Sequence, residues 1–380
     1  GCTFLTKVLL TNHFRETISL QSTKLFMEDV VLGSDQRLAD TLTGICEKQQ
    51  PRLIGVITTG LSEVKGDDVE GVIGQLSGQL EGVDIVQVPT PDYMGSLEEG
   101  YALAVEKTVE ALSLRHSAVE KGLINLLIGP HLTPGDFAEI KAVVSDFHLT
   151  AITLPDLTSL NGSRRGFSAL AGGGAAVDKI AGLSAAEMTI AIGLSMESPA
   201  KKIKALSATD YIVFEGLSSL SDVDRFMNVL SVISGRPTPQ RYIVQRDILI
   251  DAQRDASYFY GGKSICAALE TDHLVQLSRA LYEMGAPLKL AVSPGKSQRL
   301  RHVIAERKVV GDMYCLKGDF DLLITNSHGI EIAKALEIPI LQMGLPVHRQ
   351  LGYTAKVRVG YRGAAELVNE IGTILMEGHR

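Results

Sequence analysis

The chain has 380 residues, of which 45% are hydrophobic and 21% charged, and its formal net charge is −7. The length predicts two or three domains, and the composition is that of an ordinary globular protein rather than a disordered or fibrous one. The acidic balance excludes a broadly basic surface for nucleic acid or an anionic membrane. No apolar run reaches the roughly 18–20 residues of a membrane span, so we expect no membrane association.

Apolar runs and helical patterns alternate through the first 235 residues. Strands are expected at 53–58, 84–88, 124–128, 150–154 and 188–192. Helices are expected at 69–80, 97–114, 137–147 and 222–233, where apolar residues recur at helical spacing. Short apolar strands that alternate with helices are typical of a parallel sheet covered on both faces.

The sequence changes character at 235–239, Gly-Arg-Pro-Thr-Pro, a composition that suits a hinge. After a long polar helix at 241–258 the alternation resumes. The expected strands are 264–269, 288–292, 321–325 and 339–341, and the expected helices are 273–284, 297–306, 330–336 and 364–377. We therefore predict an α/β protein with three Rossmann-like, doubly wound parallel-sheet domains at 1–116, 117–236 and 237–380.

The four cysteines stand far apart, at positions 2, 46, 266 and 315, and in no CxxC pattern. Such sparse use favours a reducing compartment, so we expect a cytoplasmic protein. It also argues against a metal site built wholly within this chain, because the thiolates would have to converge from distant positions. By residue type alone, Cys2 is expected to be a small buried hydrophobe.

Two local motifs could carry chemistry. Gly172 to Gly174 precede a helix but lack the GxGxxG spacing, so a tight turn is favoured over a phosphate site. Asn326, Ser327 and His328 follow a strand's carboxyl end, where α/β proteins bind ligands. No GxSxG motif accompanies them, so a Ser-His nucleophile is disfavoured and His328 is expected to be structural. These patterns alone predict a multidomain α/β protein and no specific function.

The segment that runs from Gly1-Cys2-Thr3 to the His-Phe-Arg-Glu tetrad at 13–16 resembles the β-type subunits of the nitrogenase component 1 superfamily. The likeness continues, in the order of that family, through 54–68, 88–100, 132–136, 154–157, 233–237, 326–329 and 360–363. No single motif is specific, but together they cover nearly the whole chain. The resemblance implies the α/β fold of that superfamily.

The cysteines separate the branches of this superfamily. Catalytic β subunits that look like this chain carry three cysteines for their half of an eight-iron cluster. Only one of these matches here, Cys2, because Leu20 and Gly60 stand where the other two belong. One thiolate cannot support half of such a cluster, but it can complete a [4Fe-4S] cluster shared with another subunit. The resemblance thus implies that Cys2 is the cofactor-binding residue and iron ligand, and it implies no catalytic residue.

This cysteine pattern is similar to the scaffold branch of the superfamily, whose β-type subunit pairs with a homologous E-type subunit in a heterotetramer. The similarity implies that an iron–molybdenum cofactor precursor, held mainly by the partner, receives molybdenum and homocitrate on this complex. The mature cofactor then passes to apo-nitrogenase. The nitrogenase iron protein and a precursor-donor protein are further expected partners.

Two other functions stay open from the sequence. One is a β-type catalytic subunit of a nitrogenase-like reductase, either an alternative nitrogenase or a tetrapyrrole reductase. The other is a generic nucleotide- or sugar-binding α/β enzyme, which holds only if the resemblance misleads.

The resemblance also gives local expectations around Cys2. A Gly-Cys turn is expected to bring backbone N–H groups to the Cys2 sulfur. Gly60 and Leu20 are expected to leave space and an apolar wall. In the tetrad, Arg15 or Glu16 is expected to reach a partner subunit or to form a salt bridge within the chain.

Overall fold

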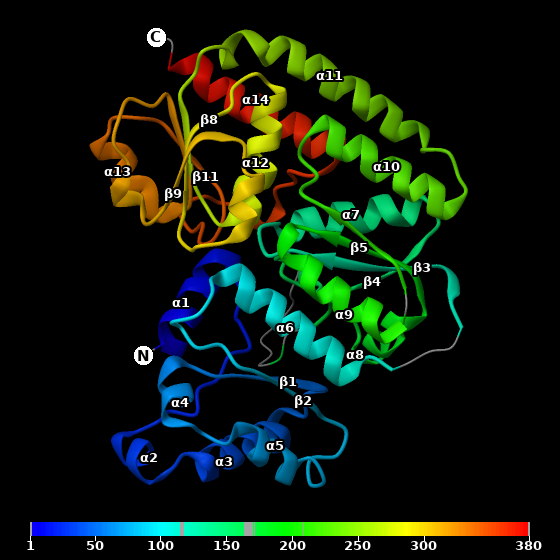
Figure 1. The fold of residues 1–380 in the computed structure, drawn as a ribbon, viewed down its shortest axis with the longest axis vertical. Coiled ribbons are helices and arrows are strands. Elements are labelled where there is room, and N and C mark those ends of the chain that lie inside the picture. Colours follow the sequence, from blue (N-terminus) through cyan, green and yellow to red (C-terminus); the bar gives the residue numbers. More distant parts are fainter. Residues whose placement is uncertain (1, 115–117, 163–169, 171, 208, 379–380) are drawn as a thin grey trace.

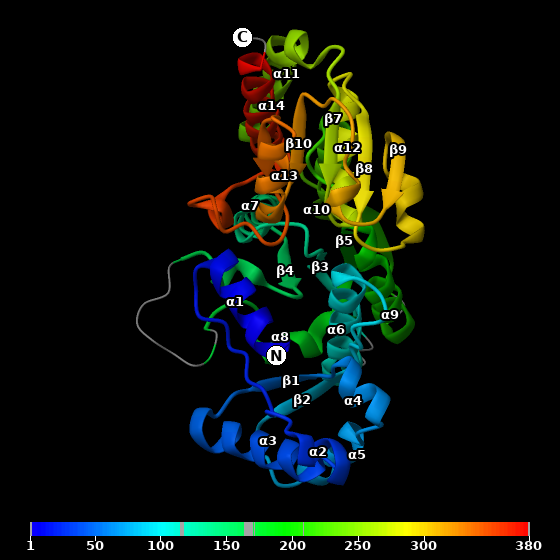
Figure 2. The ribbon, with the colours of Figure 1, turned by 90° about the vertical axis from the view of Figure 1, so that its left-hand side faces the viewer.

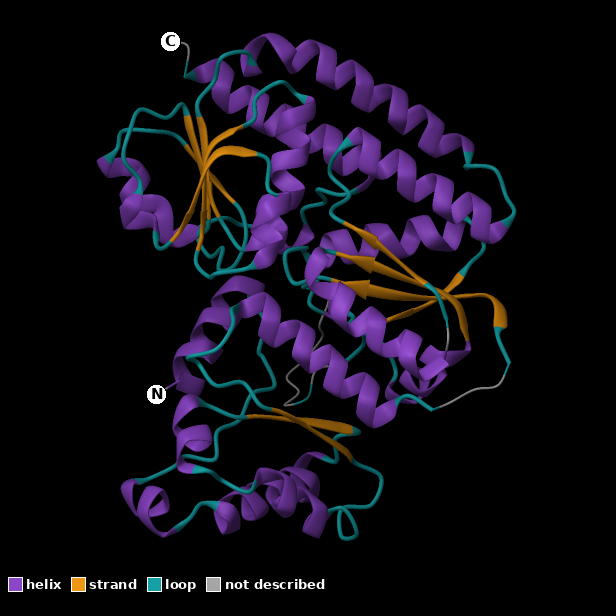
Figure 3. Cartoon of the chain, viewed as in Figure 1, coloured by secondary structure: helices purple, strands orange, loops and turns teal. Residues whose placement is uncertain are grey.

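The computed structural model of the chain describes residues 2–114, 118–162, 170, 172–207 and 209–378. Its strands form three sheets that follow one another along the chain, and the strand pairs of the described residues are parallel (Figures 1 and 3). The expected α/β fold with parallel sheets is confirmed. The domain limits at 1–116, 117–236 and 237–380 stay predictions, and each sheet takes its strands from one of these segments.

The N-terminal sheet has two strands, β1 (Leu53–Ile57) and β2 (Asp84–Val88). The helices around it are α2 (Met27–Leu32), α3 (Asp35–Gln49), α4 (Gly60–Lys65) and α5 (Val69–Leu76). Its buried core is small, because it rests on Leu42, Val72 and Leu76. Helix α1 (Cys2–Phe14) lies between this unit and the C-terminal sheet in both views (Figures 1 and 2).

The middle sheet has the order β4-β3-β5-β6. Its strands are β3 (Glu120–Ile128), β4 (Thr150–Thr153), β5 (Ala186–Ile192) and β6 (Tyr211–Phe214). Helices α6 (Leu97–Leu112), α7 (Pro134–Asp146), α8 (Val177–Ile180), α9 (Glu197–Ser207) and α10 (Leu220–Ser234) accompany it. Strand β3 is central because its last six residues are all buried, so it can pack on both faces. The sequence pattern did not predict β6 or α9.

The C-terminal sheet has the order β11-β10-β7-β8-β9, which is the Rossmann order. Its strands are β7 (Ile265–Ala268), β8 (Leu288–Ser293), β9 (Ala305–Val310), β10 (Leu322–Thr325) and β11 (Ile340–Gln342). Its helices are α11 (Gln240–Tyr260), α12 (Thr271–Glu283), α13 (Ile330–Ala335) and α14 (Gly360–Glu377).

The prediction of a helix at 297–306 is wrong. This segment forms a short 3₁₀ turn, η4 (Gln298–His302), and then enters the edge strand β9. The charged side chains of β9 belong to an edge strand that faces solvent, which is how proteins protect such an edge from pairing with another chain. The other 3₁₀ turns are η1 (Leu157–Ser159), η2 (Ala181–Ala185), η3 (Leu194–Met196), η5 (Met313–Cys315), η6 (Ser327–Gly329) and η7 (Tyr353–Ala355).

The middle and C-terminal sheets share one continuous hydrophobic core, which runs from Ile124 in β3 to Leu375 in α14. Helix α14 packs along α11 and also contacts α10, so the last helix joins the two units (Figure 1). The hydroxyl of Tyr260 donates to the Val368 carbonyl at 2.8 Å, which fixes the alignment of α11 and α14. None of the described helices is long and apolar enough to cross a membrane.

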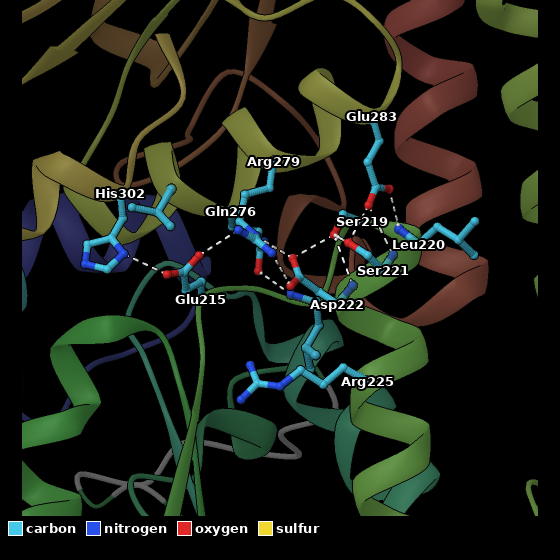
Figure 4. A network of polar contacts seen from close by, with 12 residues as sticks. Glu215, Ser219, Leu220, Ser221, Asp222, Arg225, Gln276, Arg279, Glu283 and His302 are labelled. Atoms are coloured by element: carbon cyan, nitrogen blue, oxygen red, sulfur yellow. Dashed lines mark hydrogen bonds and ion pairs between the residues drawn. The ribbon is translucent and has the colours of Figure 1, made fainter.

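A polar network also joins the two units, at the side of α12 that faces the start of α10 (Figure 4). Arg279 donates to both oxygens of Asp222 at 2.7 Å, in the two-pronged geometry that makes such pairs strong, and it donates to Glu215 at 2.7 Å. The other oxygen of Glu215 contacts His302 Nδ1 at 2.7 Å. The Asp222 side chain is only 5% exposed, so its charge depends on Arg279.

Two further contacts of α12 satisfy backbone groups of the same loop. Glu283 accepts the N–H groups of Leu220 and Ser221 at 2.7 and 3.1 Å, which caps the start of α10. Gln276 accepts the N–H of Leu217 at 3.1 Å. Helix α12 is therefore fixed to the middle unit by side chains along its whole length.

We expect Arg279→Ala to lower the free energy of unfolding by about 2–4 kcal/mol, because Asp222 would be left buried and unpaired. The shift of the chemical denaturation midpoint measures this loss. Arg52→Ala is the matched control, because the Arg52–Asp178 pair is 63% and 76% exposed and should contribute less than about 1 kcal/mol. Equal effects of the two substitutions would contradict the structural role of Arg279.

Candidate metal-cluster site and an interdomain cavity

Cys2 is the first residue of α1, and its side chain is exposed. The expectation of a buried small hydrophobe is therefore wrong. The expected turn is also wrong for Cys2, which is already helical, while Gly1 lies outside the described residues. Cys266, in contrast, is fully buried, and burial raises the pKa of its thiol to about 12. Of the four cysteines, Cys2 is the one whose sulfur is exposed.

Large apolar side chains surround this end of the molecule without being covered. On α1, Phe4 is 70% and Leu5 68% exposed. More than half of the exposed large hydrophobic side chains of the described chain precede residue 98. The N-terminal apolar surface, as we call it, consists of Phe4, Leu5, Val8, Leu61, Val64, Tyr93 and Met94. An uncovered set of this kind is typical of a protein interface.

His13 fixes the other end of α1 to the C-terminal unit. Its ring is 6% exposed, and its Nδ1 accepts the N–H of Val347 at 2.9 Å. The ring also packs edge-on against Tyr353, with ring centres 5.5 Å apart. Burial lowers the pKa of His13 to about 4, so the ring is neutral at pH 7 and its Nδ1 is free to accept.

The remaining polar residues of the tetrad also contact backbone groups of this chain. Arg15 Nη2 donates to the His348 carbonyl at 3.0 Å, and Glu16 Oε1 accepts the Gly162 N–H at 2.6 Å. Among the described residues neither Arg15 nor Glu16 forms a salt bridge, and backbone groups of two distant loops are their partners. The tetrad thus anchors α1 to the rest of the chain.

Gly60 is the first residue of α4, after its N-cap Thr59. A β carbon at this position would overlap Asp92 Oδ1 and would lie 3.1 Å from Asp92 Cγ and 3.4 Å from Tyr93 Cδ1. The expectation of free space beside Gly60 is therefore wrong, because the Asp92 side chain occupies it. Leu20 is half-buried, and its carbonyl accepts from Lys7 Nζ at 3.2 Å.

The two motifs noted in the sequence have structural roles. A β carbon on Gly174, whose φ is +77°, would lie 2.9 Å from the Asp156 carbonyl, so a tight packed turn explains this glycine. Ser327 donates to Gln342 at 2.6 Å and accepts the His348 N–H, while the His328 side chain is exposed. Ser327 therefore holds loops together.

A cavity of about 180 Å³ lies at the carboxyl edge of the C-terminal sheet. Residues after all five strands of that sheet line it, together with Leu97 of α6 and Pro130 and His131 of the loop after β3. His131 and His273 are both buried, with ring centres 6.1 Å apart. The sequence analysis did not identify this site, because its walls come from segments that lie far apart along the chain.

Two buried acids and the half-buried Arg299 form the junction behind this cavity. Glu98 of α6 is fully buried; its Oε1 accepts the Asp272 N–H at 2.6 Å and its Oε2 accepts from Arg299 at 2.8 Å. Asp272, also fully buried, accepts the Ser195 N–H at 2.9 Å. Burial and the nearby Asp272 carboxylate raise the pKa of Glu98 well above its ordinary value.

The three parallel sheets, the exposed Cys2 and the carboxyl-edge cavity define a class of multidomain α/β protein. A model of the family described as "Nitrogenase component 1 type Oxidoreductase" matches residues 1–376. The chain belongs to this family. A solved structure of nitrogenase Cp1 at pH 6.5 has a TM-score of 0.94 and 27% identity, and the match covers 99% of this chain and 87% of that one.

Within the family, similar curated relatives carry one name, the nitrogenase iron-molybdenum cofactor biosynthesis protein NifN. The relative from Bradyrhizobium diazoefficiens is 37% identical over 393 residues, which cover all of this chain and 84% of the relative. The relative from Rippkaea orientalis is also 37% identical, and the match covers 99% of this chain and 87% of the relative. The resemblance seen in the sequence is thus confirmed.

We expect the docking of α1 to weaken as pH falls from 6.5 toward 4. In this pH window the His13 ring takes up a proton when α1 is undocked but not when it is docked. The free energy that favours docking therefore falls by up to about 3 kcal/mol. Hydrogen exchange of the Val347 amide, corrected for its intrinsic rate, measures the change. His13→Gln should remove this pH dependence, while His328→Gln, at an exposed site, should keep it. A protection factor that is flat between pH 7 and 4.5 in the unmodified chain would contradict the role of His13.

Proposed function

We propose that this chain is the β-type subunit of the scaffold complex on which the nitrogenase iron–molybdenum cofactor precursor matures before transfer to apo-nitrogenase. The observation that carries the proposal is the exposed Cys2 thiol at the start of α1, beside the uncovered N-terminal apolar surface. The 37%-identical relatives are cofactor biosynthesis proteins by name, which supports the same function. Maturation here means the insertion of molybdenum and homocitrate.

The residues around Cys2 fit one corner of a shared [4Fe-4S] cluster. An exposed thiol can be deprotonated and can bind iron, whereas a buried thiol such as that of Cys266 resists ionisation. The Asp92 side chain fills the space beside Gly60, so this chain offers no second thiolate there. When bound, the cluster supplies electron storage and a rigid link between the subunits. Cys2 holds it, and α1 fixes the position of Cys2.

A homologous E-type subunit is the partner that this proposal requires. This partner covers the N-terminal apolar surface, supplies the other cluster ligands and holds most of the cofactor precursor. Two such pairs of subunits form a heterotetramer. The nitrogenase iron protein and the precursor donor act on this complex, in the cytoplasm. Burial of Phe4 and Leu5 would provide part of the association energy, because each exposes most of its side chain in the single chain.

A catalytic β subunit of a nitrogenase-like reductase is the alternative function. The likeness to a solved nitrogenase structure does not favour it, because scaffold and catalytic members of one family share a fold. The identity is 27% to that structure and 37% to the cofactor biosynthesis relatives. The occupied space beside Gly60 also favours the scaffold over a larger cluster.

Cys2→Ala should remove or destabilise the shared cluster when the chain is purified anaerobically with its partner. The readouts are iron per heterodimer and the electron paramagnetic resonance signal of the reduced complex. Cys315→Ala is the matched control, because this half-buried cysteine lies in η5 of the C-terminal unit. Unchanged iron and an unchanged signal in Cys2→Ala would overturn the ligand assignment. Substrate reduction at the level of a catalytic nitrogenase would overturn the scaffold function.

Leu5→Asp should weaken association with the partner at least about tenfold, because a charge would be placed in a desolvated contact. Sedimentation velocity of the mixed subunits measures the loss. Val232→Asp, on the exposed side of α10 at 74% exposure, should leave association unchanged. If Leu5→Asp associates as tightly as the unmodified chain, the N-terminal apolar surface is not the interface.

A further inference from the structure

The cavity lies where the topologies of two sheets place a binding site. In the C-terminal order β11-β10-β7-β8-β9, the chain adds β8 and β9 on one side of β7 and then β10 and β11 on the other side. The strand order therefore switches between β7 and β10, and Glu270 and Asn326 follow these two strands. In the middle order β4-β3-β5-β6 the same switch in strand order lies between β3 and β5, and His131 follows β3. Crevices at the carboxyl ends of such strands are where open α/β sheets bind ligands. Here two of them open onto one cavity.

His131 has hydrogen-bonding capacity that the described structure does not use. The side chain is 7% exposed, and neither of its ring nitrogens has a hydrogen-bond partner. Gln276 is close enough to the ring to influence its pKa, and its side-chain oxygen accepts the Leu217 N–H at 3.1 Å. Buried polar atoms are rarely left unpaired, and one that lines a cavity indicates a group that binds there.

The wall composition decides which charge the cavity accepts. No lysine or arginine lines it, whereas Glu270 and Asp312 both do. The two arginines whose charges act on its titratable groups already pair with carboxylates: Arg299 with Glu98, Glu99 and Asp272, and Arg358 with Glu370. A phosphate or carboxylate ligand would therefore meet negative charge with no cation to balance it.

The turn after β7 excludes a nucleotide for a second reason. In a dinucleotide-binding Rossmann unit this turn is glycine-rich and its free N–H groups bind phosphate. Here it carries Leu269, Glu270 and Thr271, and the N–H of Asp272 already donates to Glu98. A bare metal ion also lacks support, because the described residues contain no group of three His, Cys, Asp or Glu side chains that could hold one.

We propose that this cavity binds a small aliphatic ammonium ion. The ammonium N–H groups donate to the Glu270 carboxylate and to an unprotonated nitrogen of His131. The hydrocarbon part packs against the aliphatic residues that form most of the wall, among them Leu97, Leu269 and Val292. The volume of 180 Å³ is below the range of about 300–1,000 Å³ for drug-sized ligands, so the ligand is small. The site is independent of the cluster at Cys2.

The charges around Glu270 give the site a pH dependence. Burial, together with the carboxylates of Glu99 and Asp272, raises the pKa of Glu270 to about 7 against the opposing effect of Arg299. Burial also lowers the pKa of His131 and His273, so both rings are neutral. The charged or titratable groups near Glu270 are Glu99 of α6, His131 after β3, Asp272 and His273 of α12, Arg299 of η4 and Asp312 after β9.

Isothermal titration of the full-length chain with n-butylammonium tests this inference, with butyrate and 1-butanol as ligands of similar size and different charge. We expect saturable binding of butylammonium alone, about tenfold tighter at pH 8 than at pH 6 because Glu270 ionises between them. Glu270→Gln and His131→Phe should each weaken it at least about tenfold. Glu331→Gln, at an exposed carboxyl on α13, is the control and should bind normally.

Ala268→Leu provides a test that leaves the charges intact, because Ala268 lines the cavity and the larger side chain should fill it and abolish binding. Equal binding of butyrate or butanol would overturn the proposal. Saturable zinc binding that is lost in His131→Phe would replace it with a metal site. Absence of saturable butylammonium binding, or binding that is unchanged in Glu270→Gln, would also overturn it.

Discussion

The junction of Glu98, Asp272 and Arg299 is the constraint on which the arrangement of the middle and C-terminal units depends. Glu98 comes from α6, Asp272 from α12, and the amide that Asp272 accepts comes from Ser195 after β5. Two fully buried acids would be costly beside each other, but one guanidinium, two backbone N–H groups and the raised pKa of Glu98 offset that cost. The hydrogen bonds have fixed directions, so the units meet in one orientation.

That orientation places both candidate sites. It brings the carboxyl edges of the middle and C-terminal sheets together, which creates the cavity with His131 on one side and Glu270 on the other. It also leaves the loops after β10 and β11 facing α1, where the neutral ring of His13 accepts the Val347 N–H. Contacts with distant loops thus hold the carboxyl end of helix α1. Its first residue, Cys2, stays exposed for a partner.

The sequence predicted those features that depend on local pattern. The apolar runs that became β3 and β7 are short, so their burial could be inferred. The helix expected at 297–306 was wrong, and β9 was missed because its three adjacent charged residues, Glu306 to Lys308, do not resemble the apolar run of a buried strand. Cys2 was found through family resemblance, not through its own chemistry. The cavity could not be found, because His131 and Glu270 are far apart in sequence and only the strand order brings them together. A histidine directly after a predicted buried strand was the one available signal.

The central claim is that this chain holds one corner of a cluster completed by another subunit. A cryo-electron microscopy structure of the complex, isolated and frozen without oxygen, tests it most directly. We expect density for a single [4Fe-4S] cluster bonded to Cys2 Sγ, with the partner subunit lying over Phe4 and Leu5. It predicts no cluster atom bonded at Gly60 or Leu20. A Cys2 sulfur that faces solvent in the complex, or an eight-iron cluster at this interface, would contradict it.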